Sequence, residues 1–298
     1  MENKLQIGYF ADGPWSHRAL QKILKDHSIE IKFIVPRLDT KDNTLKEMAK
    51  ANGVAYLEGV KLNSEEFYNQ AKEIGCDLFV SMSYNQIFKP RITNLPRLGT
   101  INCHAGKLPF YRGRNILNWV LINDEKEFGI TVHYIDEGID SGDIILQRTY
   151  PISDQDTYKT LLDIAYVGCA EILYDAIKML QNNEVKPVKQ TDIHPVGFYC
   201  GMRKEGDEII NWNQTSRDLF NFIRAVCKPG PGARTHLDGK EIIVNKAALV
   251  PYAPVYKSIV GQVVGKTSRG YVIKTIDSTI EISELETSVK LKIGDRLG

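Results

Sequence analysis

Short apolar runs alternate with amphipathic stretches through the first two thirds of this chain. The apolar runs of residues 5–10, 29–35 and 78–81 predict buried strands. The stretches between them predict helices over residues 13–26, 44–51 and 64–74, the last one with Ser64 as its N-cap. Strands that alternate with helices predict an α/β fold with a doubly wound, mostly parallel sheet.

Two further β-rich segments follow, and each of them runs into a polar loop. Residues 99–104 and residues 128–135 both predict strands. A long helix is predicted from about residue 156 to residue 181, and the polar residues 186–195 predict an irregular linker. We therefore expect a first domain over residues 1–190.

The pattern after residue 200 is that of a different and smaller domain. Residues 215–227 predict an amphipathic helix, and Asp238-Gly239 between two β-rich runs is a strong hairpin signal. Further short strands are predicted over residues 261–264, 270–275 and 279–282. Several short strands joined by turns predict a small β-barrel within residues 200–298.

Composition and charge limit the classes of protein to which this chain can belong. The 298 residues are 43% hydrophobic with a formal charge of +1, which gives no overall field to attract nucleic acid. From residue 203 onward there are 15 Lys and Arg against 11 Asp and Glu, a surplus too small to decide the matter. No run approaches the roughly 20 apolar residues of a membrane helix. Because Met1-Glu2-Asn3-Lys4 leads straight into a strand, we also expect no signal peptide.

The cysteines indicate a reducing compartment. The five of them, at positions 76, 103, 169, 200 and 227, form no CxxC pair and have no zinc spacing. An odd number of unpatterned cysteines fits reduced thiols, so we expect a cytoplasmic protein. Gly8 and Gly13 do not make a GxGxxG fingerprint, so a dinucleotide site has little support.

The first candidate for chemistry is the run Asn102-Cys103-His104 at the end of a predicted strand. Residues two apart on a strand point to the same side, so Asn102 and His104 should project together. An amide N–H can hold a developing oxyanion, and an imidazole suits proton transfer near neutral pH. An N-x-H pair alone is more often structural than catalytic, so this motif needs a partner.

The second candidate is the acidic loop of residues 136–143, which joins two predicted strands. Its Asp, Gly and Asp spacing is similar to the start of a calcium loop. However, Gln147 stands where the twelfth ligand should be Glu, and strands rather than helices flank the loop, so we expect no metal. His133, inside the strand before the loop, is interpreted as a packed or solvated histidine rather than a second catalyst.

Taken together, the two motifs resemble a known family. The runs Asn102-Cys103-His104-Ala105-Gly106-Lys107-Leu108-Pro109-Phe110-Tyr111-Arg112-Gly113 and Asp136-Glu137-Gly138-Ile139-Asp140-Ser141-Gly142-Asp143 are similar to those of the N10-formyltetrahydrofolate-dependent formyltransferases. The resemblance covers nearly the whole chain and implies a Rossmann-like catalytic domain over residues 1–190 and an OB-like barrel over residues 200–298. It departs from the family at Ala105–Pro109, where Ser-Leu-Leu-Pro or a relative is usual.

The resemblance also implies roles for the motif residues. Asn102 and protonated His104 would stabilise the tetrahedral oxyanion when an amine attacks the formyl carbon. Asp140 would orient His104 and help to remove the proton of the amine, and the sequence leaves open whether His104 or Asp140 takes that proton. The same resemblance predicts no covalent intermediate and no metal.

The folate pocket is likewise implied by the family. Two segments would line this pocket. The first contains Asn85, Gln86, Ile87 and Phe88, and the second contains Asp136, Glu137 and Ile139. Ile87 and Phe88 would supply apolar walls, and the backbone would supply polar contacts. The alternative for the first segment is a simple hydrophobic anchor between a loop and a strand.

The acceptor is the open question. Residues 111–119 resemble the nucleotide-sugar N-formyltransferases, and the short mixed-charge segment of residues 36–39 lacks the basic insertion of methionyl-tRNA formyltransferases. We therefore expect a nucleotide-sugar substrate, first of all dTDP-4-amino-4,6-dideoxyglucose, for lipopolysaccharide or O-antigen synthesis, and no nucleic-acid or membrane partner. The candidate substrate contacts are Trp15, Lys107, Arg112 and Arg203, each with a purely structural alternative.

Other functions remain as alternatives. Methionyl-tRNA formyltransferase is the first of them, and a folate-binding protein without transfer activity is a second from another class. A formyl-folate hydrolase is a third. The family resemblance further implies a homodimer.

Overall fold

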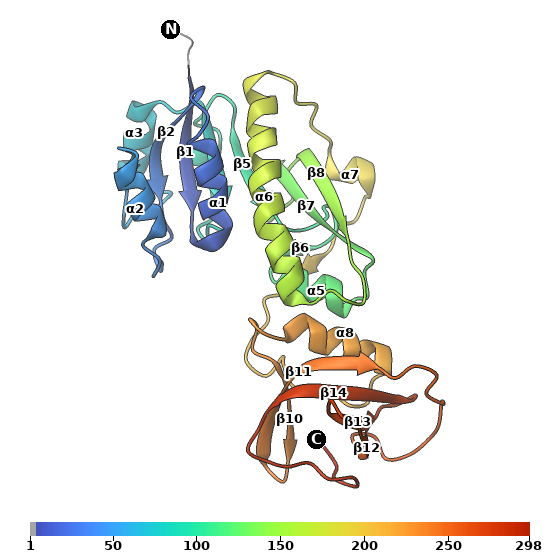
Figure 1. Cartoon of the computed structure of the whole chain (residues 1–298). Coiled ribbons are helices and arrows are strands. Elements are labelled where there is room, and N and C mark those ends of the chain that lie inside the picture. The colour runs from blue at the N-terminus through green and yellow to red at the C-terminus, as the bar shows by residue number, and fades with distance from the viewer. Residues whose placement is uncertain (1–3) are drawn as a thin grey trace. The chain divides into compact units, whose positions relative to one another are not determined.

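The computed structural model describes residues 4–298 (Figure 1). Met1, Glu2 and Asn3, which entered the prediction that no signal peptide is present, lie outside the described residues. The chain forms two compact units. The first comprises Met1–Gly113, Gly129–Tyr150 and Ile164–Tyr199, and the second comprises Arg114–Phe128, Pro151–Asp163 and Cys200–Gly298.

A seven-stranded sheet forms the centre of the first unit, in the order β3-β2-β1-β4-β5-β7-β8. Its strands are β1 (Leu5–Ala11), β2 (Ile29–Val35), β3 (Ala55–Tyr56), β4 (Leu78–Met82), β5 (Thr100–His104), β7 (Glu127–Tyr134) and β8 (Ile144–Pro151). The strands from β3 to β5 are parallel, whereas β7 runs antiparallel to β5. The predicted mostly parallel α/β sheet is therefore confirmed, together with the strand positions in residues 5–104.

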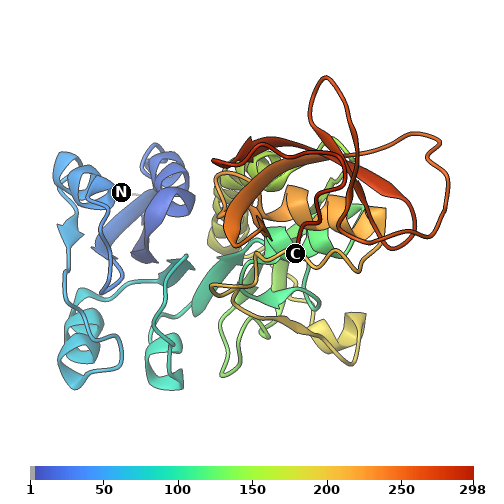
Figure 2. The same ribbon diagram turned by 90° about the horizontal axis from the view of Figure 1, so that it is seen from below.

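Helices cover both faces of this sheet. They are α1 (Gly13–Ile23), α2 (Thr44–Ala51), α3 (Glu65–Ile74), α4 (Pro90–Thr93) and, in the later part of the chain, α6 (Tyr158–Gln181) and α7 (Gln190–Ile193). Figure 2 shows α1 and α2 on one side of the sheet and α3 and α4 on the other. Ser64 caps α3 as expected, because its hydroxyl accepts a hydrogen bond from the Phe67 N–H at 3.2 Å.

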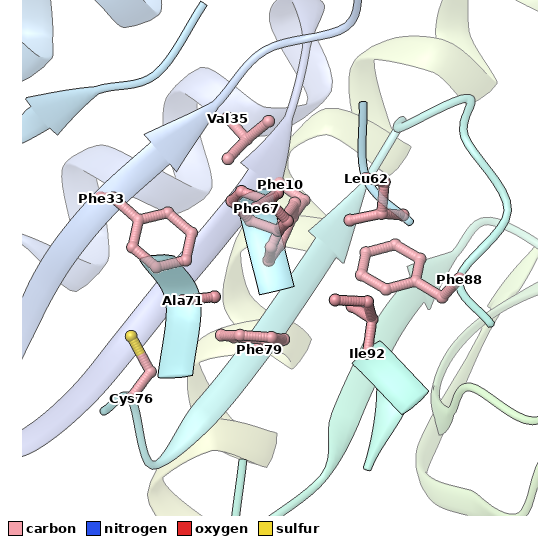
Figure 3. Packing of buried hydrophobic residues seen from close by; sticks show 10 residues of the cluster. All are labelled: Phe10, Phe33, Val35, Leu62, Phe67, Ala71, Cys76, Phe79, Phe88 and Ile92. Carbon is pink, nitrogen blue, oxygen red and sulfur yellow. The ribbon is translucent and has the colours of Figure 1, made fainter. Parts of the chain in front are cut away.

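An aromatic core lies between the sheet and helix α3. Figure 3 shows Phe10 at its centre, and the rings of Phe79 and Phe88 each lie 5.1 Å from the Phe10 ring in edge-on contact. Gly8 belongs to this packing, because a Cβ there would lie 2.5 Å from the ring of Phe33. Its role is close packing of a strand against an aromatic ring.

The segment predicted as an irregular linker is more ordered than expected. Val188 exchanges two backbone hydrogen bonds with Ile144 at 2.8 and 2.9 Å, and the short helix α7 follows. Gln190, at the start of α7, is only 3% exposed. The prediction of a linker was wrong here, because a polar stretch can be held by hydrogen bonds to buried backbone that the sequence does not display.

The second unit is a small antiparallel β domain with two helices. The helices are α5 (Ile116–Ile122) and α8 (Ser216–Val226), and the strands are β10 (Ala233–Leu237), β11 (Lys240–Leu249), β12 (Val263–Lys266), β13 (Tyr271–Lys274) and β14 (Thr279–Glu286), in the order β10-β11-β14-β13-β12. A separate two-stranded ladder pairs β6 (Arg112–Gly113), which belongs to the first unit, with β9 (Tyr199–Cys200). The predicted hairpin is confirmed at Asp238 and Gly239, which have φ angles of 51° and 75°. Across residues 4–298, no helix is both long enough and apolar enough to cross a membrane.

Candidate active site

Strand β5 presents Asn102 and His104 on one face. Its buried residues are Thr100, Ile101 and Cys103, whereas Asn102 and His104 are only partly buried. This arrangement follows from the two-residue repeat of a strand. The structure therefore places the amide and the imidazole side by side on the accessible part of the sheet, as the sequence predicts.

The acidic loop returns to this strand. Because β7 is antiparallel to β5, Tyr134 lies opposite Ile101, at the beginning of β5. The loop then folds back, and Asp140 Oδ2 lies 3.6 Å from His104 Nδ1, at the other end of the strand. Gly142 makes the return possible, since a Cβ there would lie 2.0 Å from the carbonyl oxygen of Tyr134.

His104 faces a hydrogen-bond acceptor at each ring nitrogen. Nε2 lies 2.7 Å from the carbonyl oxygen of Tyr111, and Nδ1 faces the Asp140 carboxylate. An imidazole with an acceptor at both nitrogens is best satisfied as the doubly protonated imidazolium. Tyr111 and Asp140 both have left-handed backbone, with φ angles of 55° and 50°. Such strain in non-glycine residues concentrates at functional sites.

The Asp140 carboxylate is stabilised in its ionised form. Burial alone would raise the pKa of Asp140, but the charge of His104, the neighbouring His133 and the backbone N–H of Gly113 together hold the pKa well below its usual range. The Gly113 N–H donates to Asp140 Oδ2 at 2.9 Å. The result is a partly buried pair of an imidazolium and a carboxylate.

His133 is closer to the site than the sequence suggested. It is packed, as predicted, with 2% exposure, but it lies directly opposite Asn102 in the sheet. Its Nε2 lies 3.2 Å from Asn102 Nδ2 and 3.5 Å from Asp140 Oδ1. Its role was missed because the contact depends on the antiparallel register of β5 and β7, which the sequence does not reveal.

Gln190 is a second residue that sequence analysis missed. Its Nε2 donates to the carbonyl oxygens of Asp140 and Gly142, both at 2.8 Å. Its Oε1 accepts from Nε and Nη2 of Arg112 at 3.0 and 2.6 Å. One buried amide therefore connects the acidic loop to Arg112. A single Gln in a polar stretch carries no sequence signal for this role.

The first predicted folate segment is divided between structural and accessible side chains. Gln86 is structural, since its amide binds the backbone of Val60 and Leu62 at 2.9 and 3.0 Å. Asn85 donates to Asp39 at 3.1 Å. Ile87 is 72% exposed, whereas Phe88 is only 5% exposed. Phe88 thus differs from the expectation of an open apolar wall, because its ring completes the aromatic core.

The second predicted folate segment is accessible. Asp136 shapes it, because its Oδ1 accepts hydrogen bonds from the Gly138 N–H at 3.0 Å and the Ser141 hydroxyl at 2.7 Å. Glu137 is exposed, and Ile139 is an uncovered aliphatic side chain with 58% exposure. Among residues 4–298 no group of three or more His, Cys, Asp or Glu side chains is placed to hold a metal ion.

The four predicted substrate contacts lie in different surroundings. Trp15 packs edge-on against Tyr166, with ring centroids 4.8 Å apart, and the partly buried Lys107 packs close to Gly129. Arg112 contacts Gln190 and the hydroxyl of Tyr199, the latter at 3.4 Å.

Arg203 belongs to the second unit. Its guanidinium lies 5.9 Å from the Trp119 ring and 5.7 Å from the Phe222 ring, and it donates to the carbonyl oxygen of Asp207 at 2.6 Å. Among the four candidates, Arg112 is connected to the acidic loop through Gln190.

Comparison with known proteins identifies the kind of enzyme that has this architecture. Residues 10–169 match the sequence model of the Formyl transferase family, and residues 203–294 match that of the Formyl transferase C-terminal domain. A methionyl-tRNA formyltransferase of Pelotomaculum thermopropionicum is 34% identical over 255 residues, which are 85% of this chain and 80% of the relative. A methionyl-tRNA formyltransferase of Caldanaerobacter subterraneus is 35% identical, again over 85% of this chain and 80% of the relative.

Solved structures with this fold include sugar-modifying enzymes. WlaRD, a sugar 3N-formyl transferase solved with dTDP and 5-N-formyl-THF, has a TM-score of 0.70 and 24% identity, over 98% of this chain and all of that one. An N-formyltransferase of Helicobacter canadensis, solved with folinic acid and dTDP-3-aminofucose, has a TM-score of 0.67 and 23% identity, over 95% of this chain and 100% of that chain. At these identities the likeness shows the fold.

Proposed function

This chain belongs to the formyltransferase family, and we propose that it formylates the amino group of a nucleotide-linked sugar. The enzyme class and the co-substrate N10-formyltetrahydrofolate follow from the family. The observation that carries the site assignment is the convergence of Asn102, His104 and Asp140 on the accessible face of β5.

The residues present suit the formyl donor. When bound, N10-formyltetrahydrofolate supplies an activated formyl carbon and a nitrogen leaving group. The site offers a hydrogen-bond donor for a formyl oxygen in the Asn102 amide, and the His104 ring lies beside it on the same face of β5. Ile87 and Ile139 offer uncovered apolar surface of the kind that a flat heterocycle covers.

Each member of the trio has a distinct role in this proposal. Asn102 donates an N–H to the oxyanion, and His104 holds its positive charge beside the same oxygen. Removing one such donor from an acyl-transfer site costs about 3–4 kcal/mol of transition-state stabilisation. Asp140 orients His104. The attacking amine gives up its proton to the His104–Asp140 pair, directly or through water, and a proton passes to N10 of the donor as the bond between the formyl carbon and N10 breaks.

The charges near the site favour a small anionic acceptor. The Arg112 guanidinium has amide and hydroxyl partners but no carboxylate partner within residues 4–298, so its charge is left to bind an anion such as a diphosphate. The nearby loop after β2 offers little for a phosphate backbone, because Arg37 is bound by Asp39 at 2.7 and 2.9 Å.

The finer parts of the proposal follow from the family and the solved relatives. The ligands named for WlaRD and for the Helicobacter canadensis enzyme support a dTDP-linked amino sugar, and our first candidate is dTDP-4-amino-4,6-dideoxyglucose, as a precursor of lipopolysaccharide O-antigen. We propose a catalytic domain over residues 1–190 and an accessory domain over residues 200–298. All five cysteines are free thiols, which supports a cytoplasmic location, and we propose a homodimer.

A second candidate function is supported by the sequence relatives. Methionyl-tRNA formyltransferases align with 85% of this chain at 34–35% identity, a closer sequence likeness than the 24% to WlaRD. The same trio would then act on the amino group of a methionine carried by initiator tRNA. Binding to tRNA would fall steeply with salt concentration, because phosphate contacts release counterions.

One assay separates the two candidates. The purified chain is incubated with N10-formyltetrahydrofolate and either a panel of dTDP- and UDP-linked amino sugars or charged initiator tRNA, and formylated product is detected by mass spectrometry. We expect a dTDP-linked amino sugar to gain one formyl group. Formylation of the charged tRNA with no reaction of any sugar would overturn the proposal in favour of the second candidate.

A further inference from the structure

His133 is a buried histidine with polar atoms of the site on one side of its ring. It lies opposite Asn102 in the β5–β7 ladder and is 2% exposed. Side chains at directly opposed positions of an antiparallel pair are close enough to interact. Within residues 4–298, the Asn102 side chain forms one hydrogen bond, and its partner is His133.

The two nitrogens of His133 face different kinds of partner. Nδ1 lies 2.7 Å from the carbonyl oxygen of Tyr134, which can only accept, so the proton belongs on Nδ1. Nε2 then carries a lone pair, and at 3.2 Å it faces Asn102 Nδ2, which can only donate. The neutral ring with its proton on Nδ1 satisfies both contacts.

The distances around Nε2 of His133 point to the same tautomer. The groups that face it are Asp140, whose Oδ1 lies 3.5 Å away, and beyond Asp140 the ring of His104. Nε2 lies closer to the Asn102 amide nitrogen, at 3.2 Å, than to Asp140 Oδ1, at 3.5 Å, so the hydrogen bond from Asn102 is its main contact.

We propose that His133 is a positioning residue that fixes the orientation of the Asn102 amide. By accepting one N–H of Asn102 Nδ2, His133 leaves the other N–H of the same group for the formyl oxygen. Without this acceptor the amide is free to rotate and to present Oδ1, which repels a developing oxyanion. The inference rests on the proposed function of Asn102, and it assigns to His133 an effect on catalysis through Asn102 alone.

Kinetics of variants test whether His133 acts through Asn102. His133→Leu removes the acceptor and should lower kcat about tenfold to 100-fold, as expected for a misplaced catalytic group, with KM for both substrates unchanged. His133→Gln places an amide oxygen near the position of Nε2 and should recover most of this loss. In the background of Asn102→Ala, His133→Leu should have no further effect on kcat, because its target is gone.

A matched control separates this effect from a general loss of packing. Val132→Ala changes the adjacent buried residue of β7, whose side chain points to the other face of the sheet, and should lower Tm without lowering kcat. An equal fall of kcat for His133→Leu with and without Asn102 would overturn the proposal. Unchanged kcat in His133→Leu would overturn it as well.

The protonation state offers a test that needs no activity. In the ¹⁵N NMR spectrum of the histidine side chains, assigned by the loss of signals in His133→Gln, we expect His133 to carry its proton on Nδ1 and a lone pair on Nε2. A proton on Nε2 would contradict the proposal even in an enzyme that formylates a sugar. If no acceptor is formylated, the proposed function fails, while the NMR result still decides the state of His133.

Discussion

Two clusters of charged and polar side chains surround one aspartate each, Asp140 and Asp124, and they lower the pKa of that aspartate by different means. In the first unit Asp140 lies 3.5 and 3.6 Å from two histidines and accepts one backbone N–H. In the second unit Asp124 accepts hydrogen bonds from Arg217, including one from Nε at 3.0 Å, and from Lys126 at 3.0 Å. The pKa of each carboxyl is held well below its usual range.

The difference between the clusters lies in their partners. An arginine is always charged and binds a carboxylate through a fixed planar geometry, so the cluster of Asp124 is closed and structural. A histidine gains and loses its proton near neutral pH, and those around Asp140 stand beyond ideal hydrogen-bond length. The side chains around Asp140 are paired in charge but not fixed by short hydrogen bonds. Such a cluster can shift its protons or side chains when charge develops on a reacting group.

The largest effect should come from removing the charge at the centre of the first cluster. Asp140→Asn keeps the size of the side chain but removes the anion that faces His104 Nδ1, and we expect kcat to fall about 100-fold or more. Tm should fall as well, because the stability that the ionised Asp140 contributes at neutral pH is lost. Steady-state kinetics together with calorimetry provide the measurement. An Asp140→Asn enzyme of normal kcat would remove Asp140 from the mechanism.

The matching change in the second cluster should lower stability but leave kcat unchanged. Asp124→Asn removes the carboxylate that organises Arg217, and we expect a loss of about 1–2 kcal/mol in the free energy of unfolding, because hydrogen bonds to charged groups are lost. The kcat for formyl transfer should be unchanged. Urea denaturation and the transfer assay measure the two quantities, and a fall of kcat without a loss of stability would erase the distinction between the clusters.

Gln190 extends the first cluster toward the acceptor. Gln190→Leu removes the hydrogen bonds that hold Arg112 and the carbonyl oxygens of Asp140 and Gly142. We expect KM for the acceptor to rise about fivefold to tenfold, in line with the loss of a bond to a charged group. KM for the formyl donor should stay within error. A defect confined to the donor would show that this amide serves the folate pocket instead.

The smallest effect concerns the pH dependence of stability. Because the folded pKa of Asp140 lies below the unfolded value of about 3.9, its contribution is present above that value and is lost as the pH falls toward the folded pKa. The free energy of unfolding of the native chain should therefore decrease more steeply below about pH 4 than that of Asp140→Asn. Denaturation at several acidic pH values measures the slopes, and parallel curves would contradict the low pKa.

Much of this architecture could be predicted from the sequence because it depends on local signals. The strands before residue 104, the Ser64 cap and the Asp238-Gly239 turn follow from periodicity and turn chemistry, and the structure has all three. The presence of Asn102 and His104 on one face follows from the repeat of a strand.

What could not be predicted depends on contacts between distant segments. The pairing of Asn102 with His133 needs the antiparallel register of β5 and β7, and the role of Gln190 needs a fold that returns residues 186–195 to the acidic loop. Phe88 was expected in a pocket and lies in the core, because an apolar residue beside a site has the same appearance in a sequence as one beneath it.

The central claim is that Asn102, His104 and Asp140 act as one unit on a single formyl group. The most direct measurement is kcat of the triple variant Asn102→Ala, His104→Ala and Asp140→Asn beside the three single variants, with formylated acceptor detected by mass spectrometry. Residues that act as a unit are strongly non-additive, so we predict that the triple variant is no slower than the slowest single variant. A triple variant whose loss equals the product of the three single losses would contradict the account.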